Sequence, residues 1–147
     1  MKKYQILLAE DNEGDILLTR ECLEESGRNI ELSVVRDGKE AQDFVSGIGA
    51  YTHAPAPDLI LLDINLPKKT GLEVLQFIKG HDHLRCIPVI LLTTSASDKD
   101  VSRAYCNYAN AFIMKPTDAE VYFATMKSLT EFWLNAVSLP KINLQRI

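Results

Sequence analysis

Short apolar runs alternate along the whole chain with longer stretches in which apolar residues recur at helical spacing. Five runs rich in Leu, Ile, Val or Phe have the length of buried strands, near 4–9, 30–36, 58–62, 88–92 and 111–114. Five helical stretches follow them, near 14–26, 38–46, 71–80, 98–108 and 118–136. This alternation predicts an α/β fold, a doubly wound sheet of five parallel strands with helices on both faces. We expect residues 1–137 to form one domain.

Capping residues mark the helix starts. At four predicted starts a polar residue precedes an acid by three positions: Asp37 and Glu40, Thr70 and Glu73, Ser97 and Asp100, Thr117 and Glu120. This spacing lets the side chains cap backbone groups at a helix start. Residues 47–57, rich in Gly and Pro, predict a loop before the third strand. Residues 138–147 are expected to form an extended tail, with no separate output domain.

Charged and hydroxyl side chains come directly after four of the five apolar runs. They are Glu10 and Asp11 after the first, Asp63 after the third, Thr93 and Thr94 after the fourth, and Lys115 after the fifth. Because ligands of parallel sheets bind beyond the carboxyl ends of the strands, we expect these groups to share one crevice. Crowded carboxylates favour a cation, and Mg²⁺ prefers oxygen ligands. An ammonium group binds phosphate. The sequence therefore predicts a site for Mg²⁺ and a phosphoryl group.

Lys115 is followed by Pro116, a candidate cis proline that would turn the chain and aim the lysine inward. Since Lys115 ends a strand among polar residues, we expect its removal to leave no core cavity and to change stability little.

Composition excludes several other classes of protein. The net charge of −4, with no long basic run, argues against binding to nucleic acid. The first apolar run is too short for a signal peptide or a membrane span. Cys22, Cys86 and Cys106 are odd in number and lack zinc-ligand spacing, which indicates reduced thiols in the cytoplasm.

In order and spacing, the polar residues resemble the receiver domain of two-component response regulators. The matching segments span nearly the whole chain: 10–12, 63–67 with Gly71, 92–94, Phe112 and 115–116. The resemblance implies a flavodoxin-like receiver fold and a sensor histidine kinase as partner. It also implies roles for single residues. Asp63 would accept the phosphoryl group, and Mg²⁺ would be held by Glu10, Asp11, Asp63 and the backbone carbonyl of Asn65.

By the same resemblance, Thr93 would be the switch hydroxyl with Thr94 beside it, Phe112 the rotating aromatic, and Lys115 the phosphoryl-binding cation. Residues 11–15, the long loop before Asp58, residues 92–95 and the segment 105–110 are also similar to single-domain regulators paired with phytochrome-type histidine kinases. That narrower resemblance implies homodimers. Output through protein contacts and onward transfer to a histidine phosphotransfer protein both stay open.

Two other functions fit the residues less well than a phosphoacceptor switch that is not a dedicated enzyme. A Mg²⁺-dependent aspartyl-phosphate phosphatase usually has a second Asp two residues after the nucleophile, but Asn65 occupies that position and cannot act as a general acid. A nucleotide- or flavin-binding domain needs a Gly-rich first turn, whereas the turn after Glu10 is acidic. An intermediate phosphotransfer carrier remains an alternative.

The last predicted helix carries two apolar stripes. Val121, Ala124, Phe132 and Ala136 are expected to cover the sheet. The second stripe is expected to be an exposed dimer interface, with Tyr122, Met126, Leu129 and Trp133. The tail would extend this interface with Leu139, Ile142, Leu144 and Ile147.

Overall fold

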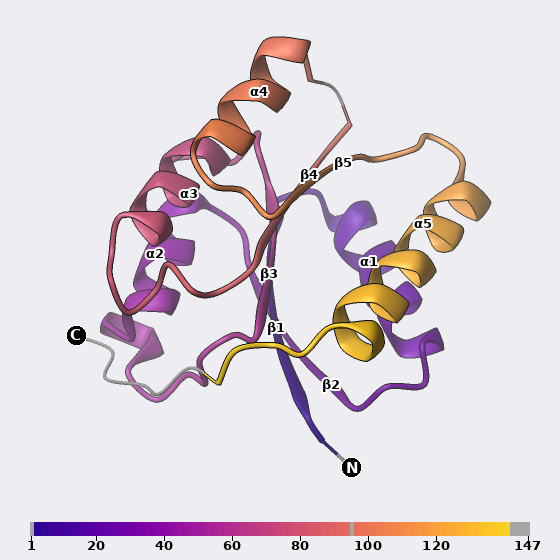
Figure 1. The fold of residues 1–147 in the computed structure, drawn as a ribbon, viewed down its shortest axis with the longest axis horizontal. Helices are drawn as coiled ribbons and strands as arrows, with labels where there is room; N and C mark the ends of the chain where they lie inside the picture. Colours follow the sequence, from indigo (N-terminus) through magenta and orange to yellow (C-terminus); the bar gives the residue numbers. More distant parts are fainter. Residues whose placement is uncertain (1, 95, 142–147) are drawn as a thin grey trace.

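The computed structural model describes residues 2–94 and 96–141. In this part of the chain, five strands form one parallel sheet in the order β2-β1-β3-β4-β5 (Figure 1). They are β1 (Tyr4–Ala9), β2 (Ile30–Val35), β3 (Leu59–Asp63), β4 (Val89–Thr93) and β5 (Ala111–Met114). The helices are α1 (Glu13–Glu25), α2 (Gly38–Ser46), α3 (Gly71–Lys79), α4 (Asp98–Cys106) and α5 (Ala119–Glu131). The predicted fold class is confirmed.

The sheet separates two layers of helices. Helices α1 and α5 cover one face, and α2, α3 and α4 lie on the other (Figure 1). Side chains of a strand point alternately to the two faces, so Ile6 and Leu8 pack toward α1 and α5 while Leu7 and Ala9 pack toward α2 and α3. Every residue of β3 and of β4 is buried, as expected for central strands of a parallel sheet.

The strand order creates a crevice at one edge of the sheet. Strand β1 pairs with β2 on one side and with β3 on the other, so the direction of winding reverses between β1 and β3. In doubly wound sheets a ligand site lies at such a reversal, beyond the carboxyl ends of the strands. Glu10 and Asp11 follow β1 and Asp63 ends β3, so the topology brings the three carboxylates together.

Three of the four predicted helix caps are confirmed, and one is wrong. Asp37 caps α2, and Thr70 and Ser97 form capping boxes at the starts of α3 and α4. The cap of α5 is Asp118 rather than Thr117, because its carboxylate accepts the Val121 N–H at 3.1 Å and lies directly before the first helical residue.

The orientation predicted for α5 is also wrong. Tyr122, Met126 and Leu129 are buried against the sheet, whereas Val121 and Phe132 are 52% and 53% exposed. The two apolar stripes are thus exchanged relative to the prediction. The Tyr122 hydroxyl forms a buried hydrogen bond of 2.8 Å with the Thr19 hydroxyl of α1, which a solvent-facing tyrosine could not make.

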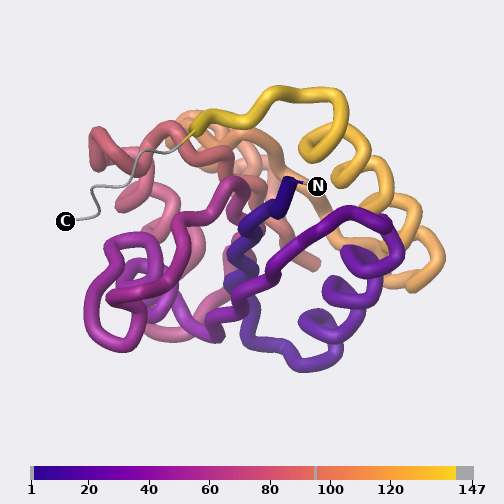
Figure 2. Tube along the Cα trace, turned by 90° about the horizontal axis from the view of Figure 1, so that it is seen from below, coloured from indigo at the N-terminus to yellow at the C-terminus, as the bar shows by residue number. Residues whose placement is uncertain are grey.

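Near the end of the described chain, the segment after α5 is hydrogen-bonded to β1, the first strand. A π-helix (Phe132–Ala136) continues α5 and half-buries Trp133, and the Tyr4 hydroxyl donates to the Leu134 carbonyl at 2.8 Å. The chain then crosses toward the side that carries α2 and α3 (Figure 2). Leu139 packs against the core on the way. Ile142, Leu144 and Ile147, and also Ser95, lie outside the described residues.

Membrane-spanning helices and the state of the three cysteines can also be read from the described structure. Among the described helices, none combines the length and apolar character that crossing a membrane requires. Cys22, Cys86 and Cys106 are free thiols.

Candidate metal and phosphoryl site

The acidic cluster is built from the ends of β1 and β3. Oxygen atoms of Glu10, Asp11 and Asp63 all lie within 4.8 Å of one another. The Glu10 N–H donates to the Val35 carbonyl at 3.0 Å and so extends the sheet by one residue. This buries the Glu10 side chain, while Asp11 is exposed. Of the two acids that follow β1, Glu10 therefore faces the core and Asp11 faces solvent.

The loop after β3 holds Asp63 by close backbone contacts. Asp63 Oδ1 accepts the Asn65 N–H at 3.1 Å, and the Gly71 N–H donates to the Ile64 carbonyl at 2.8 Å. A Cβ on Gly71 would lie 2.2 Å from the Asp63 carbonyl oxygen, and a Cβ on Gly38 would lie 1.9 Å from the Lys69 carbonyl oxygen. Only glycine fits at these two positions, which clamp the loop and fix the carboxylate at the crevice.

Lys115 enters the same crevice from the end of β5. Its Nζ contacts Glu10 Oε1, and it lies 3.1 Å from Asp15 Oδ2 and 3.4 Å from Asp63 Oδ2. The Lys115 side chain is only 4% exposed. Burial by itself would lower the pKa of Lys115, but the hydrogen bond to Glu10 and the surrounding carboxylates raise it above its ordinary value. The lysine is therefore a permanent cation of the site.

Pro116 does not aim Lys115 by a cis bond. The described residues contain no cis peptide bond, so this prediction is wrong. The Lys115 N–H instead donates to the Thr93 carbonyl at 2.6 Å. Pairing of β5 with β4 continues to this residue and is enough to direct the side chain inward.

The pKa of Glu10 is raised to about 7, chiefly because the carboxyl group is buried; Lys115 opposes this rise and the Asp63 charge adds to it. One ammonium therefore does not neutralise the crowded carboxylates. All groups of the cluster offer oxygen, the donor that Mg²⁺ prefers. The residues thus fit a hard divalent cation. In the metal-bound state, Glu10 and its neighbours would carry their full negative charge.

We expect the affinity for Mg²⁺ to rise by about tenfold from pH 6 to pH 8 and then to level off. Below about pH 7 the metal-free Glu10 is protonated, so the cation must displace a proton; above it no proton is displaced. Calorimetric titration at several pH values measures this. Glu10→Gln should bind Mg²⁺ more weakly and without the pH dependence. If the Mg²⁺ affinity of Glu10→Gln changes with pH as much as that of the natural protein, a group other than Glu10 titrates.

The predicted switch residues lie at different depths. Thr93 is fully buried, and its hydroxyl accepts from the Asn65 side-chain amide at 3.3 Å. Thr94 is exposed at the end of β4. Phe112 is half-buried on β5, where its N–H donates to the Tyr105 hydroxyl at 3.1 Å. Of these, Thr93 is joined directly to the loop that carries Asp63.

Asp15 is a site residue that sequence reasoning missed. It lies in the first turn of α1, where an acid is expected simply because it favours a helix N-terminus. Its contact with Lys115, a hundred positions later in the chain, depends on the tertiary fold, which brings the residue after β5 to the first turn of α1. The only sequence signal is a further acid four residues after Asp11.

Comparisons with known proteins agree with this geometry. Residues 6–127 match the response regulator receiver domain family. The chain is 42% identical over 135 residues to the response regulator Rcp1 of Synechocystis sp., covering 92% of each chain. A crystal structure of the phosphorylated cyanobacterial phytochrome response regulator RcpA superimposes with a TM-score of 0.92 at 42% identity, covering 95% of this chain and 100% of the other. The Mn²⁺-bound form of Rcp1 gives 0.90 at 41% identity, with 94% and 99% covered.

The chain belongs to the receiver domain family of response regulators. Proteins of this family act in two-component signalling with a histidine kinase partner. Receiver domains bind Mg²⁺ in an acidic pocket, and Glu10, Asp11 and Asp63 form that pocket here.

Proposed function

We propose that Asp63 accepts a phosphoryl group from a phosphohistidine of a sensor histidine kinase, in a reaction that requires Mg²⁺. The observation that carries this proposal is the convergence of Asp63 with Lys115 and with the acidic pair Glu10 and Asp11 at the sheet reversal. Asp63 is buried at the carboxyl end of the central strand β3, and its side chain is still 11% exposed.

The chemistry follows from these positions. A carboxylate oxygen of Asp63 attacks phosphorus, the P–N bond to the donor imidazole breaks, and an aspartyl phosphate forms. Asn65 N–H holds one carboxylate oxygen, and the Lys115 ammonium offsets negative charge near the other. Glu10, Asp11, Asp63 and the backbone carbonyl of Asn65 would hold Mg²⁺, which when bound neutralises charge on the transferring group.

The proposed output is a change of protein contacts. The aspartyl phosphate attracts the Thr93 hydroxyl away from the Asn65 amide, and Phe112 moves into the space that Thr93 leaves. Thr94 would stand at the rim of the phosphoryl site. The chain is then a switch whose self-catalysed steps are phosphoryl transfer and loss, rather than a dedicated enzyme. The amide of Asn65 still weighs against a phosphatase, while an intermediate phosphotransfer carrier remains the second candidate.

Incubation with acetyl phosphate and Mg²⁺, followed by mass spectrometry of the peptides, tests the proposal. We expect one phosphoryl adduct, on Asp63, that is absent when EDTA removes the metal. An adduct on another residue, or undiminished labelling in EDTA, contradicts the proposal.

The proposed kinase partner is of the phytochrome type, since the similar RcpA is described as a phytochrome response regulator. Residues 1–137 would form the receiver domain and 138–147 its tail. A cytoplasmic location is supported by the three free thiols. Phosphotransfer profiling against a panel of histidine kinases identifies the partner. Preferential transfer from a kinase without a phytochrome sensor would contradict the light-sensing link.

A homodimer is also proposed, although not through the predicted stripe, because Tyr122, Met126 and Leu129 are buried. Exposed apolar residues on α4, β5 and α5 support an interface there: Tyr105, Met114 and Val121. We expect sedimentation at micromolar concentration to show dimers that Val121→Asp disrupts, while Leu17→Asp, at an exposed position of α1, does not. A monomer with and without phosphorylation would contradict the dimer.

A further inference from the structure

One carboxylate partner of Lys115 lies outside the acidic cluster of Glu10, Asp11 and Asp63. The ammonium contacts Glu10, Asp15 and Asp63, and a protonated lysine has three N–H groups to donate. Glu10 and Asp63 also belong to the cluster that binds the cation, so they share their charge with it. Asp15 alone is a counter-ion for Lys115 without being part of that cluster.

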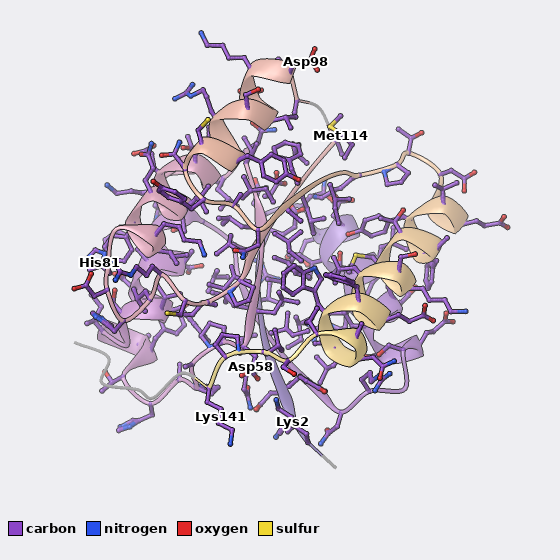
Figure 3. The ribbon with its side chains drawn as sticks, in the orientation of Figure 1. Lys2, Asp58, His81, Asp98, Met114 and Lys141 are labelled. Atoms are coloured by element: carbon purple, nitrogen blue, oxygen red, sulfur yellow. The ribbon has the colours of Figure 1, made fainter. Side chains whose placement is uncertain are left out.

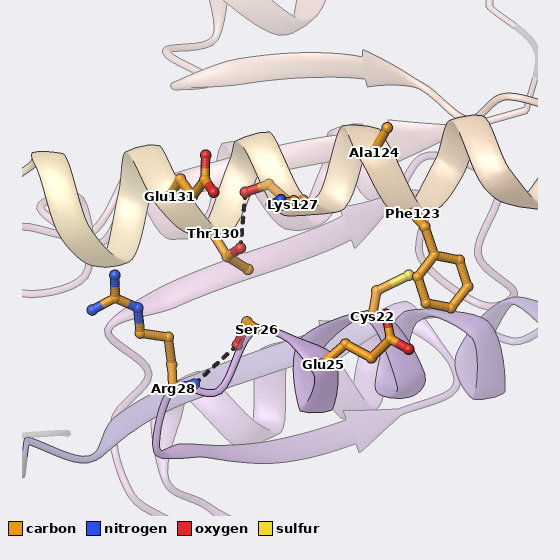
Figure 4. Close-up of a pocket in the computed structure, with 9 residues that line it drawn as sticks. All are labelled: Cys22, Glu25, Ser26, Arg28, Phe123, Ala124, Lys127, Thr130 and Glu131. Atoms are coloured by element: carbon orange, nitrogen blue, oxygen red, sulfur yellow. Dashed lines mark hydrogen bonds between the residues drawn. The ribbon is translucent and has the colours of Figure 1, made fainter.

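The position of Asp15 is fixed by its helix. Its N–H donates to Asn12 Oδ1 at 2.9 Å, in the N-cap of α1. One turn further along, the Thr19 hydroxyl bonds to the Tyr122 hydroxyl of α5 at 2.8 Å. Cys22 then faces Phe123 across the groove between the two helices (Figure 4). The side of α1 that carries Asp15 is therefore packed toward α5, and it presents the carboxylate to Lys115, the residue that follows β5.

We propose that Asp15 is a positioning residue that holds the Lys115 ammonium at the mouth of the site, in competition with the phosphoryl group on Asp63. The inference rests on the proposed function. A phosphoryl group can gain an N–H of Lys115 only if one carboxylate gives it up. Asp15 is the most solvated of the three partners, with its side chain 33% exposed against 2% for Glu10 and 11% for Asp63. Water can replace the ammonium at Asp15 at the lowest cost.

The same contact links the site to a helix. While Asp15 holds Lys115, the first turn of α1 is tied to the end of β5. When the ammonium turns to the phosphoryl group, this tie is released and the Thr19–Tyr122 bond remains. Asp15 thereby favours the unphosphorylated arrangement of Lys115.

Binding of beryllofluoride at saturating Mg²⁺ tests the proposal. We expect Asp15→Asn to bind this phosphoryl mimic about three- to fivefold more tightly, the scale of one partly exposed ion pair. Asp15→Glu should stay within twofold of the natural protein, since it keeps the charge. The matched control is Glu13→Gln, which removes an acid from the same helical turn. Glu13 pairs with Arg36 at 2.6 Å and is 74% exposed, so its loss should change affinity less than twofold.

A second readout separates positioning from a general effect of charge. In the metal-free protein, the NMR signal of the Lys115 ammonium should shift in Asp15→Asn and not in Glu13→Gln. An unshifted signal, or beryllofluoride binding equal to that of the natural protein, overturns the proposal. If the natural protein itself binds no beryllofluoride, the proposed function fails instead, and the NMR signal still decides whether Asp15 holds Lys115. Thermal melting of each variant verifies that it is folded.

Discussion

Replacing Asp63 by Asn is expected to lower phosphorylation by acetyl phosphate by at least about a thousandfold, the scale on which enzymes lose activity when their attacking nucleophile is removed. The amide oxygen can still accept the Asn65 N–H, so the loop should keep its shape. The variant lacks the nucleophilic carboxylate and one negative charge of the acidic cluster. Intact-protein mass spectrometry, with Mg²⁺ present, measures the labelled fraction over time.

Asp58→Asn is the matched control, because Asp58 precedes the same strand that Asp63 ends. Asp58 Oδ2 accepts the Gln5 N–H at 2.8 Å, and Figure 3 shows Asp58 toward the end of the sheet away from Met114. This variant loses a charge near the strand but should be labelled normally. Normal labelling of Asp63→Asn, or equal losses in both variants, would mean that Asp63 is not the acceptor.

Replacing Lys115 by Ala should destabilise the metal-free protein by about 3 kcal/mol, because removing one partner of a buried ion pair leaves a buried charge uncompensated. The side chains of Lys115 and Glu10 are 4% and 2% exposed. Mg²⁺ should restore part of the loss, since the cation neutralises the same carboxylates. Urea unfolding with and without Mg²⁺ gives both values. We also expect slower phosphorylation, because the ammonium beside Asp63 is lost.

Lys68→Ala controls for removal of a lysine near the site. Lys68 pairs with Asp37 at 3.4 Å but is 66% exposed, so the change should cost less than about 1 kcal/mol. Equal stabilities of Lys115→Ala and the natural protein without Mg²⁺ would show that the buried pair contributes nothing to folding.

The sequence was enough to predict the sheet and most of the site, for physical reasons. Central parallel strands are buried on both faces, so β3 and β4 appear in the sequence as unbroken apolar runs, each ending in a polar side chain at the crevice. The ends of these runs then locate Glu10, Asp63, Thr93 and Lys115 by topology alone.

The errors arise where local patterns allow two solutions. Helix α5 has two apolar stripes, and only contacts such as Tyr122 with Thr19 determine which one meets the sheet. Burial of Lys115 among three carboxylates also reverses the expectation that its removal is harmless, since a strand end that looks polar in sequence is enclosed in the fold. Asp15 was missed because its partner is distant along the chain.

The central position of β1 has a consequence for folding during synthesis. Strand β1 leaves the ribosome before its partner β3, which begins only at Leu59. At about 5–20 residues per second, roughly 3–10 s separate the two strands. During that time one side of an apolar strand lacks its final neighbour. Nascent chains arrested shortly before and after β3 emerges should therefore differ in protease resistance, and the earlier one should be the better substrate for chaperones that bind apolar segments.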